Sequence, residues 1–268
     1  MQLNGYSMSQ NPDINRKNEE TRRINSRPEK VRMARSYNQD CILAYALDIL
    51  GERWTLLIAR ELLLGPRRFA DLHTGLPGIG TNLLSKRLKE LETQQLIEID
   101  GTGPNRHQYR LTQMGEMLRP TIRSLMMWSI KYYLSQPEAS ESNEVSDLIS
   151  SNNLNSDSVA LAVELFAPFV EPYEHDYVAH LTVDGGQYTL YYMGHDLIAR
   201  RGQDAPASAS LEVSIEQAMN AFRGDISRKS LRASIVSSGR EEVVNHIIDC
   251  FSREGKHYRE KHADKLTA

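Results

Sequence analysis

Small polar and cationic residues recur at helical spacing in one segment of the first half of the chain. They are Thr81, Asn82, Ser85, Lys86 and Lys89. Asn and Ser side chains can hydrogen-bond base edges in a DNA major groove, and Lys can neutralise phosphates. The same residue types also suit a solvated helix face, so this pattern alone leaves both interpretations open.

An apolar stripe opposes these polar residues. Leu84, Leu88 and Leu91 stand at i, i+4 and i+7, which predicts a helix over 81–92 with its leucines buried. Thr81 is the expected N-cap of that helix. A helix with leucines inward and Asn, Ser and Lys outward meets the requirements for lying in a major groove.

A loop with a cationic tip follows this helix. Two short runs, 96–100 and 108–111, have the residue types of strands, and turn-forming residues lie between them. The tip residues Asn105, Arg106 and His107 suit the minor groove or the phosphate backbone beside a major groove. Helix and hairpin together favour DNA binding over a merely solvated surface.

Further helices must position this helix and hairpin. The predicted helices span 41–50, 53–64, 69–76 and 112–134. Gly51 and Gly65 are the expected stops of the first two, because glycine ends helices readily. Pro120 lies inside the last one and is expected to kink it.

Two runs of residues carry a resemblance to a known family. They are GERWTLLIARELLLGPRRFADL at 51–72 and LPGIGTNLLSKRLKEL at 76–91. Over 41–134 the chain resembles the HxlR-type winged helix-turn-helix regulators of bacteria. The resemblance implies a homodimer on operator DNA, with dimer contacts from the first helix and from helix 112–134. It also implies that helix 81–92 reads DNA and that the hairpin near 101–108 is the wing.

A cysteine stands at the start of the first predicted helix. Many members of that family carry one there, and in some the thiol senses oxidants or electrophiles, which makes Cys41 a candidate redox sensor. A helix N-terminus favours the reactive thiolate. The alternative is a small, inert, buried residue. Ile42 follows it where many relatives have Pro, and Cys250 is expected in the core because it lies in an apolar stripe.

The second half of the chain changes from helical spacing to alternation. Strands are expected over 177–183, 188–192, 197–199, 209–213 and 231–235, and helices over 214–222 and 238–251. Asp184-Gly185 predicts a hairpin turn, and Ser214 with Gln217 predicts a capping box. A mainly antiparallel sheet with a few helices places the whole chain in the α+β class.

This half also resembles the sterol-carrier-protein-like fold. The residues that carry the resemblance are HLTVDGGQYTL at 180–190, IARRG at 198–202, ASLEVSIEQAM at 209–219 and FRG at 222–224. The resemblance implies an apolar tunnel between sheet and helices. Its candidate lining residues are Tyr188, Leu190, Tyr192, Met219 and Phe222, which would equally serve as ordinary core.

Sequence patterns of enzymes are missing. There is no Gly-x-Ser-x-Gly elbow, phosphate-binding Gly-x4-Gly-Lys-Ser/Thr loop, His-Glu-x-x-His or Cys-x-x-Cys. We therefore expect a protein that is not an enzyme and needs no cofactor. The cluster at 174–176 with His180 fits a solvated loop better than a metal site. Two cysteines are too few for a disulfide scaffold or a structural zinc site.

A chain of 268 residues is expected to form two domains, because a domain has roughly 150 residues. The residue patterns place the boundaries. The expected parts are a disordered basic arm at 1–37, a winged helix domain at 38–135, a linker at 136–156, a sterol-carrier-like ligand-binding domain at 157–252 and a charged tail at 253–268. No apolar run long enough to span a membrane and no signal peptide are present in the sequence. A cytoplasmic protein without membrane contact is therefore expected.

The formal net charge of −3 conceals two opposite halves. Residues 1–135 hold 20 Lys and Arg against 14 Asp and Glu, whereas residues 136–268 hold 12 against 21. A basic half suits phosphate binding and an acidic half avoids it. We expect a dimeric regulator whose second domain binds a hydrophobic small-molecule effector. The alternative is a carrier of hydrophobic ligands whose first domain serves only dimerisation.

Overall fold

The computed structural model describes residues 36–101, 107–134 and 154–251. It divides into two compact units, one ending at Arg53 and the other beginning at Trp54. Nearly all of the predicted arm, most of the predicted linker and the predicted tail lie outside the described residues. The domain boundaries expected near 38, 135 and 157 stay predictions.

The first unit contains helix α2 (Ile42–Leu50). Cys41 takes extended backbone angles at the N-cap position, and its carbonyl accepts the Tyr45 amide at 3.0 Å. Gly51 is the C-cap residue, as its place in the sequence predicts. The helix therefore begins one residue after the predicted start.

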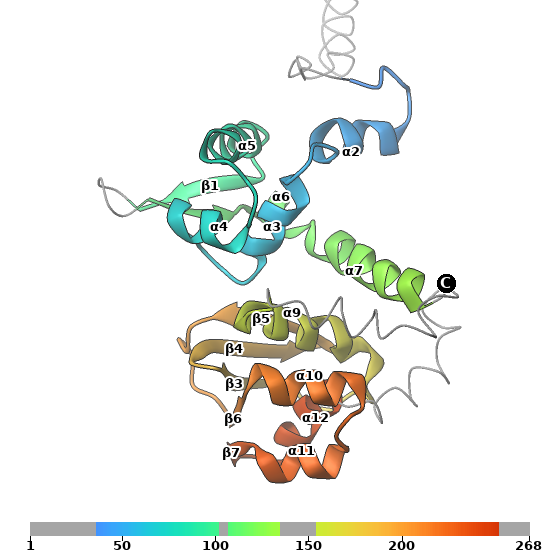
Figure 1. The fold of residues 1–268 in the computed structure, drawn as a ribbon, viewed down its shortest axis with the longest axis vertical. Coiled ribbons are helices and arrows are strands. Elements are labelled where there is room, and N and C mark those ends of the chain that lie inside the picture. The colour runs from blue at the N-terminus through green and yellow to red at the C-terminus, as the bar shows by residue number, and fades with distance from the viewer. Residues whose placement is uncertain (1–35, 102–106, 135–153, 252–268) are drawn as a thin grey trace, which may run out of the picture. The chain divides into compact units, whose positions relative to one another are not determined.

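The second unit opens with two helices followed by the predicted DNA-reading helix (Figure 1). They are α3 (Thr55–Leu63), α4 (Phe69–Gly75) and α5 (Thr81–Thr93). The sequence predicted all of them within two residues. Gly80, rather than Thr81, is the N-cap of α5, and Thr81 is its first helical residue. Gly80 has the extended backbone angles of an N-cap residue, and glycine is among the residue types found at that position.

A small sheet follows α5. Strands β1 (Ile97–Asp100) and β2 (Gln108–Leu111) pair in antiparallel fashion, with Ile97 opposite Leu111. Arg67 adds an isolated bridge to Tyr109, with N–H to oxygen distances of 2.7 and 2.9 Å between their backbones. The loop between α3 and α4 is thereby paired with strand β2 at the residue opposite Ile99.

The long helix predicted over 112–134 is two helices. α6 (Gln113–Glu116) begins at Thr112, whose hydroxyl accepts the Gly115 amide at 3.1 Å, and α7 (Arg119–Leu134) begins just before Pro120. Proline lacks an N–H and its ring clashes with the carbonyl four residues earlier, here that of Glu116. The expected kink is therefore a full break, and Pro120 occupies the first turn of α7, where proline is tolerated.

The third part of the second unit is a five-stranded sheet in the order β5-β4-β3-β6-β7. The strands are β3 (Tyr177–Val183), β4 (Gly186–Met193), β5 (Asp196–Arg201), β6 (Ala209–Val213) and β7 (Val236–Gly239). Only the β3–β6 pair is parallel. The expected α+β class and mainly antiparallel sheet are confirmed, whereas the sterol-carrier likeness stays a prediction.

Tight turns join the first strands of this sheet. Asp184 and Gly185 have φ of 44° and 82°, and Gly194 and His195 have φ of 56° and 69°. Two successive positive φ values define the type I′ turn, whose twist matches that of a two-residue hairpin. The hairpin predicted at Asp184 is therefore confirmed.

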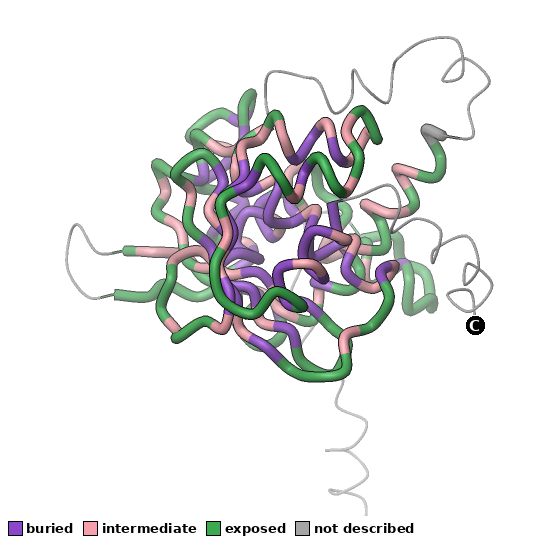
Figure 2. Tube along the Cα trace, turned by 90° about the horizontal axis from the view of Figure 1, so that it is seen from below, coloured by how far each residue is buried: buried purple, intermediate pink, exposed green. Residues whose placement is uncertain are grey.

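Helices contact this sheet and one another (Figure 1). They are α9 (Ser156–Phe166), the 3-10 turn η3 (Ala167–Phe169), α10 (Ile215–Arg223), α11 (Arg228–Ser234) and α12 (Glu241–Phe251). Along β3 every second residue is buried, and buried and exposed residues alternate along much of the trace (Figure 2). The capping box of Ser214 and Gln217 is present as predicted.

The strand predicted over 231–235 is wrong. Residues up to Ser234 belong to α11, and the strand begins at Val236. Ser227 caps the helix by accepting the Ser230 amide at 3.1 Å. Leu231 and Ile235, both buried, are four residues apart, a spacing that suits a helical turn as well as alternation.

Candidate nucleic-acid interface

Helix α5 separates its residues into two faces. The stripe of Leu84, Leu88 and Leu91 is buried, with at most 3% of any side chain exposed. The five residues predicted to contact DNA are all exposed on the same helix: Thr81, Asn82, Ser85, Lys86 and Lys89. Burial of the stripe fixes the helix to the body of the unit and leaves the polar face open to a partner.

Two ion pairs to Glu90 lie on and beside this face. Lys86 Nζ lies 3.9 Å from Glu90 Oε1, one turn further along, and both side chains are about half exposed or more. Arg87 is mostly buried and lies 2.5 Å from the other oxygen of Glu90. Exposed pairs contribute little free energy, so Lys86 can exchange its carboxylate for a phosphate.

The hairpin of β1 and β2 has a mixed charge. Arg110 pairs with Glu98 at 2.9 Å and with Asp100 at 3.6 Å, so its charge is matched within the hairpin. His107 is exposed beside the start of β2. The other two predicted tip residues, Asn105 and Arg106, lie outside the described residues.

The two cysteines differ in accessibility. Cys41 is exposed at the N-cap of α2, and Cys250 is buried in α12, as expected of a core residue. An exposed thiol at a helix N-terminus has the surroundings that a sensing cysteine requires. Its sensing role stays a prediction.

Large apolar side chains are exposed on α2 and α7. On α7, Leu125, Trp128 and Tyr132 are between 45% and 60% exposed, and the last two rings stack with centroids 5.2 Å apart. On α2 the exposed residues are Ile42, Leu43, Tyr45 and Leu47. These are the two helices that the resemblance assigned to dimer contacts, and exposed apolar patches commonly mark protein interfaces.

The candidate lining of a ligand tunnel is buried and packed. Tyr188, Leu190, Tyr192 and Met219 are each less than 9% exposed. Tyr192 stacks on Tyr177 with ring centroids 4.9 Å apart, and Phe222 lies between Phe166 and Phe251 at 5.3 and 5.4 Å. Tyr192 and Phe222 thus belong to separate aromatic groups, and Tyr188 instead donates its hydroxyl to Asp157.

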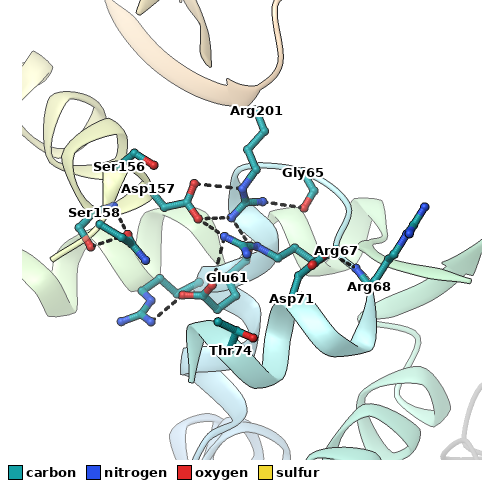
Figure 3. A network of polar contacts seen from close by, with 12 residues as sticks. Glu61, Gly65, Arg67, Arg68, Asp71, Thr74, Ser156, Asp157, Ser158 and Arg201 are labelled. Atoms are coloured by element: carbon teal, nitrogen blue, oxygen red, sulfur yellow. Dashed lines mark hydrogen bonds and ion pairs between the residues drawn. The ribbon is translucent and has the colours of Figure 1, made fainter. Parts of the chain in front are cut away.

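A buried ionic cluster joins helix α3 and the loop after it to the sheet (Figure 3). Arg67 and Arg201 both bind the carboxylate of Asp157, Arg201 through Nε at 3.0 Å and through a terminal nitrogen at 2.9 Å. Tyr188 donates its hydroxyl to the same carboxylate at 2.7 Å. Burial lowers the pKa of Arg201 and of Arg67. We call these residues, with Glu61, the Arg201 cluster.

A second buried cluster centres on Arg119, the first residue of α7. One terminal nitrogen lies 2.7 and 2.8 Å from the two oxygens of Glu164, and the other lies 2.6 Å from the Leu63 carbonyl. Glu116 accepts from Nε at 3.3 Å, and Arg200 joins Glu116 at 3.1 Å. Burial lowers the pKa of Arg119, but Glu164 and Glu116 more than offset this and the pKa rises. We call this set the Arg119 cluster.

The two clusters together cap the C-terminus of α3. A helix leaves its last carbonyls without partners and carries partial negative charge there. The Arg201 side chain donates to the carbonyls of Glu61 and Gly65, and its backbone amide donates to Leu64 at 2.7 Å. The Leu63 carbonyl receives Arg119 and Arg200. Residues more than 130 positions later in sequence thus complete this helix.

Neither these clusters nor helix α9, which supplies Asp157 and Glu164, is predicted by the sequence patterns. One clue was available. Glu61 and Glu164 interrupt otherwise apolar helical runs, and charged residues are rarely buried without a partner. The identity of the partners was out of reach, because no local pattern connects them.

Within the described residues no cluster of three or more His, Cys, Asp or Glu is arranged to hold a metal ion, and residues 174–176 with His180 form none. Among the same residues, no helix combines the length and apolar character needed to cross a membrane.

Known proteins match the first half of this chain. Residues 49–137 match the family of HxlR-like helix-turn-helix proteins. The HTH-type transcriptional regulator YvaP of Bacillus subtilis is 37% identical over 89 residues, which are 32% of this chain and 82% of YvaP. An HTH-type transcriptional regulator of Mycobacterium tuberculosis is 45% identical over 95 residues, 35% of this chain and 59% of the relative.

A solved structure matches the same region. The crystal structure of quinone-bound YodB from B. subtilis is 31% identical, covers 33% of this chain and 96% of YodB, and gives a TM-score of 0.30. The family match and the extent of the match to YvaP decide the classification. The chain belongs to the HxlR-like helix-turn-helix family and is a transcriptional regulator with a helix-turn-helix DNA-binding domain.

Proposed function

We propose that the protein is a homodimer that reads operator DNA with the exposed face of α5. The observation that carries the proposal is the division of this helix into a buried leucine stripe and an exposed face of Asn, Ser and Lys. Asn82 and Ser85 are the proposed base contacts, and Lys86 and Lys89 contact bases or phosphates. The hairpin tip, which includes His107, contacts the adjacent backbone.

The dimer contact in this proposal comes from α2 and α7. Leu125, Trp128 and Tyr132 leave an apolar face on α7 that is unusual for a surface helix. Trp128→Glu is expected to convert the dimer to a monomer in sedimentation experiments. Met193→Glu is the matched control, since Met193 is also an exposed large apolar residue but lies on β4. Equal association of both variants contradicts the assigned contact.

Selection of DNA by the full-length protein tests the reading of operator DNA. Duplexes with a randomised central region are incubated with the protein, and bound molecules are sequenced. The expected result is an inverted repeat whose affinity falls steeply with salt, because binding releases counterions from the phosphates. Enrichment of no sequence contradicts the proposal.

An effector role for the second domain is also part of the proposal. Its support is the group of apolar and aromatic residues in the sheet and its helices, among them Tyr192 of β4 and Met219 and Phe222 of α10. Calorimetric titration with palmitate tests it, and Met219→Trp is expected to weaken binding by filling space. Absence of heat and of any change in DNA affinity contradicts an apolar effector of this class.

Redox sensing by Cys41 is a separate proposal, supported by the exposure of its thiol. Mild oxidation is expected to change DNA affinity of the native protein and to leave Cys41→Ser unchanged. An equal response in both proteins contradicts a sensing role.

The carrier hypothesis, in which the first domain only dimerises, is not favoured. The matched relatives are named as transcriptional regulators. For the same reason we propose that the protein is not an enzyme.

A further inference from the structure

Arg119 connects three parts of the second unit at the point where α7 begins. It is only 5% exposed, and its three nitrogens donate to Glu164 of α9, to the Leu63 carbonyl of α3 and to Glu116 of α6. The buried carboxylate of Glu164 in turn accepts the Ala199 amide of β5 at 3.1 Å. A single side chain thus links the helix-turn-helix region, α7 and the five-stranded sheet with the helices that pack on it, which we call the sheet domain.

Other contacts hold the same three parts. Arg200 and Arg201 of β5 bind carbonyls at the end of α3. Arg123, one turn into α7, lies 2.7 Å from Asp196 at the start of β5. β5 therefore binds both α3 and α7 through side chains, and α7 carries the proposed dimer face.

This geometry opposes rotation of α7 relative to α3. A guanidinium is planar, and its donors point in fixed directions. Moving α7 would separate Arg119 from the Leu63 carbonyl or from Glu164. Water does not readily replace the lost partner, because both side chains are nearly inaccessible.

We infer that the sheet domain is a positioning element, which fixes α7 on the helix-turn-helix region and so sets the spacing of the two operator half-sites. The inference rests on the proposed dimer and its use of α7. Two reading helices that face one DNA must match the half-site separation, which follows the helical repeat of about 10.5 base pairs. Arg119, Glu164, Arg123 and Asp196 are the positioning residues.

The test measures spacing preference in full-length protein. Duplexes carry the half-sites selected by the native protein, either at the selected separation or with one inserted base pair, which turns one half-site by about 34°. The variants are Glu164→Gln, in the buried cluster, and Asp196→Ala, which removes the exposed partner of Arg123 on α7 and a local acceptor of the Leu197 amide. Asp249→Asn is the matched control, since its ion pair with Arg228 connects α11 to α12 within the sheet domain.

Native protein and Asp249→Asn are expected to lose about tenfold or more in affinity on insertion, a loss comparable with one mismatched base pair. Glu164→Gln is expected to lose less than threefold on insertion, and Asp196→Ala an intermediate factor, with affinity for a single half-site unchanged. Circular dichroism establishes that each variant is folded. Undiminished spacing preference in folded Glu164→Gln and Asp196→Ala overturns the inference and leaves the proposed function standing.

If the native protein selects no DNA, the proposed function fails. Amide hydrogen exchange then tests, without DNA, whether Glu164 holds α7 on the helix-turn-helix region. Faster exchange at residues 64–67 and 119–123 in Glu164→Gln than in Asp249→Asn supports the contact. Equal exchange in the two variants overturns it.

Discussion

The face of α5 and the Arg119 cluster use the same kinds of side chain in opposite surroundings. The Lys86 side chain is 64% exposed and lies 3.9 Å from the Glu90 carboxylate, whereas the Arg119 side chain is 6% exposed and lies 2.7 Å from Glu164. The exposed cation keeps its hydration and can change partners. The buried one has given up water and is satisfied only by the protein groups around it.

This difference shows that charged side chains have two separate roles in one chain, one in DNA binding and one in fixing the fold. A reading surface must bind and release DNA, so its cations have weak partners within the protein. A connection between the helix-turn-helix region, α7 and the sheet must hold one geometry, so its cations are bound from several directions. Removal of a charge is therefore expected to reduce binding in the first region and stability in the second.

The largest expected effect is that of Glu164→Ala. It leaves Arg119 buried without its carboxylate, which typically lowers the free energy of unfolding by about 3–5 kcal/mol. Denaturation in urea, followed by circular dichroism, measures the loss. A loss below about 1 kcal/mol, the range of exposed pairs, would place the Arg119 cluster in the same class as the surface pairs.

Lys86→Ala is expected to act on binding instead. The affinity for selected DNA should fall by about 1–3 kcal/mol if Lys86 contacts a base, and by less if it contacts a phosphate. Fluorescence anisotropy measures the affinity, with Lys229→Ala on α11 as the control. Unchanged affinity would remove Lys86 from the interface, and a large loss of stability would contradict its exposed character.

The buried His246 makes the stability of the fold depend on pH. It is 5% exposed, and burial lowers its pKa below the ordinary 6.5, with Asp249 opposing the shift. Because the unfolded chain takes up the proton more readily, the contribution of neutral His246 to stability is present above pH 6.5 and is lost as pH falls below it.

The unfolding free energy should therefore decline below that pH by at most about 1.4 kcal/mol per unit for this one group. His246→Asn offers the Tyr177 hydroxyl, now 2.8 Å from Nδ1, another acceptor without a titrating ring. Urea denaturation between pH 5 and pH 7 should show a shallower decline in this variant. An identical decline in both proteins would assign the pH dependence to other groups.

The smallest expected effect is that of Arg110→Ala. Its pairs with Glu98 and Asp100 are about half exposed, and such pairs contribute about 0–1 kcal/mol. Thermal denaturation should place this variant close to the native protein. A loss as large as that of Glu164→Ala would erase the distinction between exposed and buried charge.

Local patterns were sufficient for most of the fold. The leucine stripe of α5, the alternation of β3 and the Asp184-Gly185 turn each depend on neighbouring residues, and each was predicted correctly. Leu231 and Ile235 were misassigned, because a spacing of four is compatible with helix and with strand. The break at Pro120 was underestimated as a kink.

The exposed candidates of the site could be named in advance, because an exposed face follows from the position of the buried one. Contacts that bring distant residues together could not. Glu164 meets Arg119 across 45 positions, and Arg201 meets Glu61 across 140. These contacts exist only in the folded chain, and no periodicity within either segment predicts them.

Because the chain is synthesised from its N-terminus, α3 is completed long before some of the residues that cap it. The Leu63 carbonyl and Arg200 are separated by 137 residues, so a ribosome adding about 5–20 residues per second completes α3 roughly 7–27 s before Arg200 is added. During that interval the rest of the helix-turn-helix region and Arg119 are synthesised, but Arg200 and Arg201 are not yet available to the carbonyls at the end of α3. The helix-turn-helix region is therefore synthesised before the two sheet residues that hold the end of α3.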